Sequence, residues 1–366
     1  MMKSKLALAA LLTCVALAPA AARPAKAKHT SSAKAKPSAK AKAPAKGKAA
    51  KAAAVSTVAA AAAAEAAPVA AAPSQNRNDR YMDTLSMQFV TALWRIDPEA
   101  GIGVGKFDTA AKLTIPDAAS RSKQLAFIDE WLDKFGKLNA DKLSPNQRSD
   151  LALLINKLQA DRWRLTTFRE FEWNPAQYNV AQSLDLILNT EYAARPQRLR
   201  TILKRLGDVP AYYQAAQASI KNPTHEHTQL AIAQAPGTLV VLADLGKAAQ
   251  DSAQLNAQEK TIFAQRIANA GSAVLAWVDY LTDLDKSQAQ MARARSFRIG
   301  KALYEQKFTF EIQSANSGEQ TYRKALAARE ELLTRMDALA DQLWEKTVGS
   351  AAKPQDRYKK IGMVID

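Results

Sequence analysis

The sequence is poor in the residues that bind transition metals or form covalent cross-links. Its 366 residues include one cysteine, Cys14, and three histidines, His29, His225 and His227. A single cysteine rules out an internal disulfide framework, and a mature form that begins beyond Cys14 has no thiolate nucleophile. Three histidines are too few for a histidine-rich metal centre.

Aromatic residues are missing from the first 80 positions, since all 10 Phe, 6 Trp and 9 Tyr residues lie at or after Tyr81. A segment without large apolar side chains cannot build a core, so we expect the folded body over residues 77–366. The formal net charge of +16 is also uneven: residues 23–76 carry nine lysines and Arg23 against Glu65. The body keeps a net charge of only +5, which is typical of an ordinary surface.

Residues 1–22 have the layout of a secretory signal peptide. Two lysines precede an apolar run over residues 6–18, and small residues around Ala20 offer cleavage sites. The run is too short to span a bilayer, so we expect a periplasmic or secreted protein without a transmembrane segment in its mature form. Thr13 and Cys14 faintly resemble a lipoprotein box, but the apolar run continues past the cysteine, which favours a plain signal peptide over a lipid anchor.

Residues 23–76 are rich in Ala, Lys and Pro, and we predict that they form a disordered linker. Five prolines interrupt the segment, and it has too little apolar area to offset the entropy cost of ordering. A plain spacer is the favoured role, and a tether to an anionic cell-envelope polymer is the alternative. Lysine-rich tails also bind DNA, but the export signal points to another compartment and disfavours a nucleic-acid partner.

The pattern of residues 77–366 predicts an all-α body of eight to ten helices, without the two-residue alternation of a sheet. Ser144 and Ser317 stand where N-caps are expected. The clearest apolar stripe runs over residues 263–284 with spacings that alternate between four and three, so we expect it to face a partner helix. The helix opened by Ser317 carries a second stripe, formed by Leu332, Met336, Leu339 and Leu343.

The sequence around His225, Glu226 and His227 is the one place where two histidines and a carboxylate cluster. Residues two apart diverge on a helix but face one side of an extended strand. Because Thr224 follows Pro223 as a cap residue, the pattern favours a solvated helix start over a metal site. We therefore reject both histidines as metal ligands.

Polar residues interrupt the apolar run around Leu184–Leu188. Asp185 and Asn189 lie four apart and share a helix face, and Tyr192 follows shortly after. Such groups either form hydrogen bonds inside a core, which is the favoured reading, or line a cleft. The arginines that follow, over residues 195–205, are expected to form a solvated or acid-paired helix face.

Seven short segments together resemble the bacterial domain-of-unknown-function 885 family, over about residues 80–366. In chain order they are residues 173–175 (Trp-Asn-Pro), 195–199 (Arg-Pro-Gln-Arg-Leu), 206–212, 220–224, 231–237, 297–304 and 329–344. The resemblance implies an exported or lipid-linked, largely α-helical protein similar to zinc metallopeptidases. It also implies that Asp185, Asn189 and Tyr192 line the substrate channel of a complete relative.

Members of that family carry a His-Glu-x-x-Pro-Gly-His motif in their second half, in which histidines bind zinc and the glutamate acts as a base. No such motif occurs in this sequence, and the His225 and His227 pair has a different spacing. We therefore expect no catalytic residue and no cofactor in this chain, with zinc present only in full-length relatives.

The resemblance further implies that residues 77–366 form one lobe of a two-lobed helical metallopeptidase and are inactive alone. The apolar stretch that ends at Asp366 agrees with this expectation. A C-terminal lobe would then be the partner, docked on an exposed apolar face. The alternative is a non-enzymatic binding or scaffold module of the cell envelope, tethered by the basic linker.

Overall fold

The computed structural model describes residues 76–290 and 295–366, and their regular elements are all helical. This confirms the predicted all-α class. The described residues form twelve α-helices rather than eight to ten, because short breaks divide the chain more often than the apolar pattern shows. The predicted signal peptide and the linker up to residue 75 lie outside the described residues.

In chain order the helices are α2 (Arg77–Ile96), α3 (Pro98–Gly103), α4 (Ala118–Gly136), α5 (Pro145–Trp163), α6 (Ala181–Asn189), α7 (Arg195–Leu206), α8 (Val209–Ser219), α9 (His225–Asp251), α10 (Ala257–Gln290), α11 (Lys301–Ile312), α12 (Gly318–Thr347) and α13 (Arg357–Ile365).

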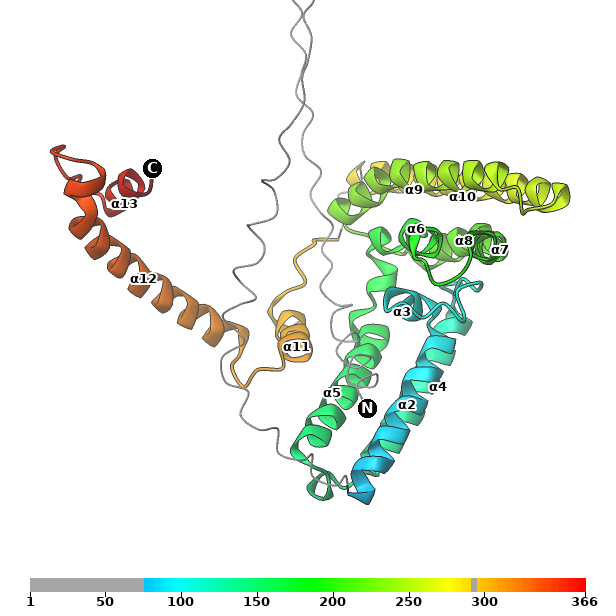
Figure 1. Cartoon of the computed structure of the whole chain (residues 1–366), viewed down its shortest axis with the longest axis horizontal. Helices are drawn as coiled ribbons and strands as arrows, with labels where there is room; N and C mark the ends of the chain where they lie inside the picture. Colours follow the sequence, from blue (N-terminus) through cyan, green and yellow to red (C-terminus); the bar gives the residue numbers. More distant parts are fainter. Residues whose placement is uncertain (1–75, 291–294) are drawn as a thin grey trace, which may run out of the picture.

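Helices α2, α4 and α5 form an N-terminal bundle, at the bottom of Figure 1. Each begins at a capping side chain: Asn76, Asp117 and Ser144 accept a hydrogen bond from the backbone N–H three residues on. The core of the bundle is aromatic, since Phe89 is fully buried and its ring centre lies 5.3 Å from that of Trp131. This core is separate from the apolar core of the next layer.

Helices α6 to α10 form a second layer, in which α9 and α10 run together over α6, α7 and α8 (Figure 1). The predicted stripe on α10 faces these neighbours: Phe263, Val274 and Trp277 are at most 2% exposed. Edge-to-face contacts join Trp277 to Tyr178, at 5.9 Å between ring centres. The structure thus confirms that this stripe faces a partner helix.

The two layers are joined where α5 ends. A π-helix over Arg164–Phe168 follows it, and Arg169 then adopts a left-handed conformation with φ of 49°. This bend stacks the ring of Phe168 on Trp163 at 4.8 Å between centres and sets it edge-on to Trp173 at 5.1 Å. The indole N–H of Trp173 donates to the Phe168 carbonyl, which fixes the bend.

One buried arginine ties α7 to the segments around it. Arg205 is fully buried, and its guanidinium lies 2.5 Å from Glu99 on α3 and donates to the Ser183 hydroxyl on α6 at 3.0 Å. It also donates to the carbonyls of Ala110 and Lys112, in the connection between α3 and α4. Burial of a charge is tolerated here because these partners replace its water.

Among the described residues, one helix, α9, is long and apolar enough to cross a membrane by length and composition. It packs against α10 and α6, and its residues Leu242 and Leu245 belong to the second core. It also exposes Asp244, Lys247 and Asp251 to solvent, which lipid would disfavour. These contacts and charges are typical of a helix that packs on its neighbours with one side and faces solvent with the other.

Helix α11 lies against α5, and the side-chain amide of Asn156 donates to the Phe310 carbonyl there at 2.9 Å. Beyond it, α12 and α13 pack on each other and form an arm to one side of the body (Figure 1). Ser317 caps the start of α12, as the sequence predicts, and forms a capping box with Gln320. Lys360 holds α13 to the arm through Asp337 and Asp341, each 2.8 Å away.

Candidate functional site

Asp185 and Asn189 line a pocket between α6 and α9, of about 300 Å³. They lie one turn apart on the exposed side of α6, and the Asn189 amide donates to Asp185 Oδ1 at 2.7 Å. The two residues share a helix face, as predicted, but the favoured expectation that they form hydrogen bonds inside a core is wrong, because both are exposed and line a pocket. The other residues around it are Leu188, Arg195, Val241, Asp244, Lys247, Ala248 and Asp251.

Tyr192 does not line this pocket. Helix α6 ends at Asn189, and in the turn that follows the Tyr192 ring stacks on Phe107, with the ring centres 3.9 Å apart. Its hydroxyl is buried without a hydrogen-bond partner among the described residues. Tyr192 thus supports the connection between α6 and α7 from the core side, because the helix that would have aligned it with Asp185 stops too early.

The pocket carries charges of both signs. Asp244, Asp251 and Lys247 come from α9 and Arg195 from the start of α7, and all four are exposed. Within the described part of the chain, no ion pair joins these four side chains. An open site of this kind can hold a small polar or zwitterionic chain, such as a peptide backbone, through contacts that compete with water.

The two histidines of the body sit in the first turn of α9, which Thr224 caps as predicted. His225 Nδ1 lies 2.9 and 3.0 Å from the two oxygens of Asp285 on α10. His227 Nδ1 instead lies 2.6 Å from the Thr224 hydroxyl. The rings therefore take different partners, as positions two apart on a helix require.

This donor set does not fit a zinc ion. Zinc sites in proteins have three or four convergent nitrogen, sulfur or oxygen ligands. Among residues 76–290 and 295–366, no three His, Cys, Asp or Glu side chains are grouped to hold a metal. The carboxylate of Asp285 pairs with His225 and also accepts a hydrogen bond from the Gln229 amide at 2.8 Å. Both oxygens of Asp285 therefore already have partners in the protein.

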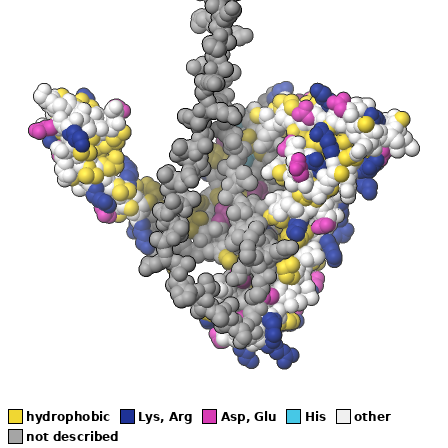
Figure 2. Space-filling model, in the orientation of Figure 1, with side chains coloured by type: hydrophobic (Ala, Val, Ile, Leu, Met, Phe, Trp, Pro, Cys, Tyr) yellow, Lys and Arg dark blue, Asp and Glu magenta, His cyan; other side chains and the backbone are white. Residues whose placement is uncertain are grey.

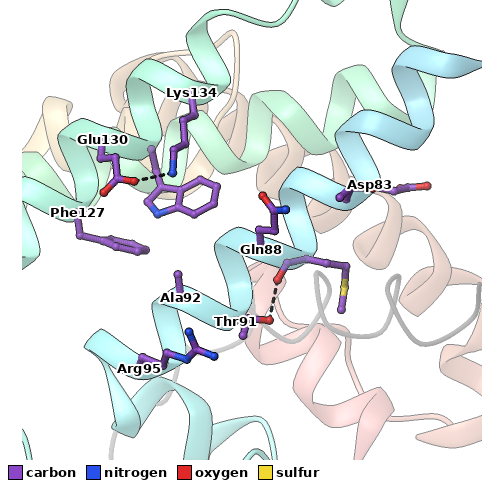
Figure 3. A pocket seen from close by; sticks show the side chains of 11 residues that line it. Asp83, Gln88, Thr91, Ala92, Arg95, Phe127, Glu130 and Lys134 are labelled. Atoms are coloured by element: carbon purple, nitrogen blue, oxygen red, sulfur yellow. Dashed lines mark hydrogen bonds and ion pairs between the residues drawn. The ribbon is translucent and has the colours of Figure 1, made fainter.

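A second and larger concave site, of about 870 Å³, lies between α2 and α4 (Figure 3). Its floor contains Trp131 and Phe127, and Lys134 covers the Trp131 ring at 4.2 Å while pairing with Glu130. Met87 stands on the α2 side with 47% of its surface exposed. The residues of α2 that line it are Asp83, Thr84, Met87, Gln88, Thr91, Ala92 and Arg95.

No pattern in the sequence predicts the groove between α2 and α4. Phe127 and Trp131 lie one turn apart on α4 and serve the bundle core, so their pattern reads as ordinary core. The groove depends on how far α2 stands from α4, and no local signal reports that separation. An apolar floor flanked by charged side chains is typical of grooves that bind an amphipathic helix.

The geometry defines the class: an all-α domain with two concave surface sites. A family described as bacterial protein of unknown function (DUF885) matches residues 98–361, and the chain belongs to this family. The match begins with α3 and ends within α13, so the arm is part of the family's fold. This confirms the resemblance seen in the sequence.

A solved structure with a similar fold is that of a protein from Shewanella oneidensis, described as a candidate lipoprotein of unknown function. The two chains are 35% identical, with a TM-score of 0.73 over 78% of this chain. The present chain spans about half of that relative, since the match covers 52% of the Shewanella chain. The relative's description is consistent with an exported or envelope location. A comparison with curated proteins gives no match.

Proposed function

We propose that this chain is an exported helical domain of a metallopeptidase-like protein of its family, and that it is catalytically inactive by itself. The observation that carries the proposal is the state of its histidines. His29 lies outside the described residues, while His225 and His227 are each engaged with a different side chain. A zinc peptidase needs convergent ligands and a base.

In this proposal the chain supplies one wall of a substrate channel, lined by Asp185 and Asn189, with Tyr192 supporting that wall from behind. The zinc and its ligands come from a further lobe. Two observations support this division of labour: the match to half of the Shewanella chain, and a pocket lined by charged and amide side chains.

The test measures metal content and hydrolysis together. Purified chain, incubated with one equivalent of zinc and passed through a desalting column, is expected to retain well under one zinc per chain and to leave a panel of fluorogenic peptides intact. The double variant His225→Ala/His227→Ala is the control and should behave the same. Stoichiometric zinc with chelator-sensitive hydrolysis, lost in the double variant, would contradict the proposal.

The proposed location is the periplasm or the medium, with residues 23–76 as a spacer or as a tether to an anionic envelope polymer. A chain without residues 23–76 separates these roles. If the segment is a tether, its loss should abolish salt-sensitive sedimentation with cell envelopes. Mass spectrometry of the mature protein tests the start, since a lipidated Cys14 would replace the plain signal peptide.

A non-enzymatic module of the envelope is the second candidate, and the groove between α2 and α4 favours it. An amphipathic Leu/Lys model helix is expected to bind there and to alter the fluorescence of Trp131. Met87→Glu should weaken this binding, whereas Tyr81→Glu, at a 57% exposed position of α2 outside the groove, should not. Equal effects of the two substitutions would argue against the groove.

A further inference from the structure

Exposed apolar side chains are concentrated in the arm and in the helix that precedes it. Of the seventeen large apolar side chains that are exposed in the described residues, five lie in residues 76–290 and twelve in residues 295–366, although the second segment is about a third as long. In Figure 2 hydrophobic side chains gather along the arm. An apolar surface of this density marks a place where a cover is expected.

Helix α12 carries apolar residues on two neighbouring sides. One side is the predicted stripe, formed by Leu332, Met336, Leu339 and Leu343, whose exposed fractions run from 39% to 54%. The other side lies about 90° around the helix. There Ala340 and Trp344 are buried, whereas Tyr322 and Leu326, which precede them by about five turns, are 63% and 42% exposed.

Helix α13 covers only part of the second side. It packs beside Ala340 and Trp344, where Lys360 meets Asp337 at 2.8 Å. A bidentate contact between Arg357 and Glu330 fixes α13 further along α12. Both contacts lie beyond Leu326, so the first turns of α12 stay open on this side, and the predicted stripe stays open on the other.

Helix α11 extends this apolar surface. Tyr304 and Ile312 are 49% and 56% exposed, and Phe308 between them packs on the Tyr304 ring at 6.0 Å between centres. The three residues lie four apart and share one side of the helix. Tyr304 also adjoins the start of α12, because a Cβ atom added to Gly318 would come within 2.8 Å of its ring. We call the exposed apolar residues of α11 and α12 the open surface.

The breadth of the open surface argues for a cover made of several helices. A coiled-coil partner covers one narrow stripe, whereas a helix inside a globular unit has a wider apolar side. Only three of the 30 residues of α12 are buried, and apolar residues lie on two of its sides. The helix also carries six acidic residues and five basic ones, without the positive excess that favours membranes or nucleic acids. The favoured occupant is therefore a folded unit of protein.

We propose that the further lobe docks on the open surface. This lobe is the polypeptide that corresponds to the part of the Shewanella protein outside the match, and the inference rests on the proposed function, which assigns the zinc ligands to it. Two comparisons favour this occupant. The family model runs through the arm to residue 361, so the arm belongs to the family's fold. The match spans only about half of the Shewanella chain, so the other half is long enough to supply several helices.

The test measures how fast a single thiol on the open surface reacts with a maleimide. In a chain with Cys14→Ser, Leu339→Cys carries the only thiol. Leu275→Cys is the matched control, because Leu275 lies on α10, outside the arm, and is 53% exposed against 52% for Leu339. In the chain alone, both thiols should react at similar rates.

A chimera supplies the lobe, with residues 76–366 in place of the matched part of the Shewanella protein. In the chimera the Leu339→Cys thiol should react at least tenfold more slowly than in the chain alone, while the Leu275→Cys thiol should keep its rate. An unchanged Leu339→Cys rate in a chimera that melts cooperatively would overturn the proposal. A Leu339→Cys thiol that is already slow in the chain alone, with a mass of two chains, would assign the surface to a second copy and overturn it too.

Co-expression of the lobe as a separate chain decides the matter if the chimera does not melt cooperatively. The tagged chain should then co-purify with the lobe at one to one, Leu339→Glu should abolish this, and Leu275→Glu should not. Absence of co-purification would overturn the proposal. The functional proposal is judged separately: a protected Leu339→Cys thiol without zinc-dependent hydrolysis contradicts the function alone, and hydrolysis with an unprotected thiol contradicts the docking alone.

Discussion

Replacing Arg205 by leucine should strongly destabilise the second layer. The side chain is fully buried, and it joins α7 to Glu99, to the Ser183 hydroxyl and to the carbonyls of Ala110 and Lys112. Arg205→Leu removes the donor and leaves these acceptors in place. Breaking a buried pair by removing one partner costs about 3–5 kcal/mol.

The surroundings of Arg205 narrow the expected loss in the free energy of unfolding. Glu99 keeps 38% of its side-chain surface exposed, so it can recover part of its hydration when Arg205 is lost. The main penalty then comes from the buried Ala110 carbonyl, at about 1–3 kcal/mol for a buried group left without a donor, together with the part-buried Lys112 carbonyl and Ser183 hydroxyl. We therefore expect a loss of about 3 kcal/mol in the free energy of unfolding.

Arg200 on the same helix provides the control. It also pairs with a glutamate, Glu259, at 2.6 Å, but 47% of its side chain is exposed. An exposed pair of this kind is screened by water and contributes little to stability, so Arg200→Leu should have little effect. Urea unfolding followed by circular dichroism gives both values. A loss below about 1 kcal/mol for Arg205→Leu, or equal losses for the two variants, would refute the reasoning.

Three further predictions concern acid stability, the arm and the bundle core. Hydrogen bonds from Arg169 lower the pKa of Glu172 from 4.5 to about 2, so its ionised form stabilises the fold above pH 4.5 and this contribution disappears as the pH falls to 2; melting of Glu172→Gln should depend less on pH there. Hydrogen bonds to Asp337, and to a smaller extent to Asp341, raise the pKa of Lys360 above 10.5 in the folded chain. The charge of Lys360 therefore stabilises the arm below pH 10.5, and this contribution is lost as the pH rises through the raised pKa. Lys360→Met should expose α13 to limited proteolysis at neutral pH. Phe89→Ala should cost about 3–5 kcal/mol in urea unfolding, and a cost near 1 kcal/mol would show that the bundle closes the cavity.

The helix starts and the buried stripe of α10 could be predicted from the sequence, because both depend on residues that are close together in the chain. Ser144 and Ser317 cap their helices through backbone N–H groups three residues away. The stripe of α10 needs only its own period. The extra helices are less visible: α3 starts at Pro98 directly after α2, with Asp97 as its cap, and no apolar period marks so short an element.

The arginines of α7 show why burial is harder to predict. Their period suggests one solvated or acid-paired face, and Arg200 fits that description. Arg198 and Arg205 are instead buried, and Arg198 donates to the carbonyls of Leu188 and Thr190. A guanidinium can enter a core when enough acceptors converge on it. For Arg205 those acceptors come from positions about 20 to 100 residues away, so no local pattern contains them.

One part of the candidate site could be predicted from the sequence, and another part could not. Asp185 and Asn189 share a helix face because four residues separate them, and this relation holds wherever α6 packs. Tyr192 lies only three residues beyond Asn189, but the helix has ended, and the ring is placed by its contact with Phe107 instead. The depth of the pocket depends on α9, whose polar face begins more than 50 residues later.

The apolar stripes of α10 and α12 have the same spacing but differ in burial. Alternating spacings of three and four state that a helix has a seam, and both α10 and α12 obey them. Whether such a seam is buried depends on the neighbouring helices. Helices α8 and α9 pack against α10 and bury Trp277, whereas Leu339 of α12 stays half exposed in the described part of the chain. An apolar row that stays half exposed is stable in a folded chain only at the cost of keeping water against it. The spacing alone therefore predicts that a helix has an apolar side, and the elements packed around it decide whether that side is buried.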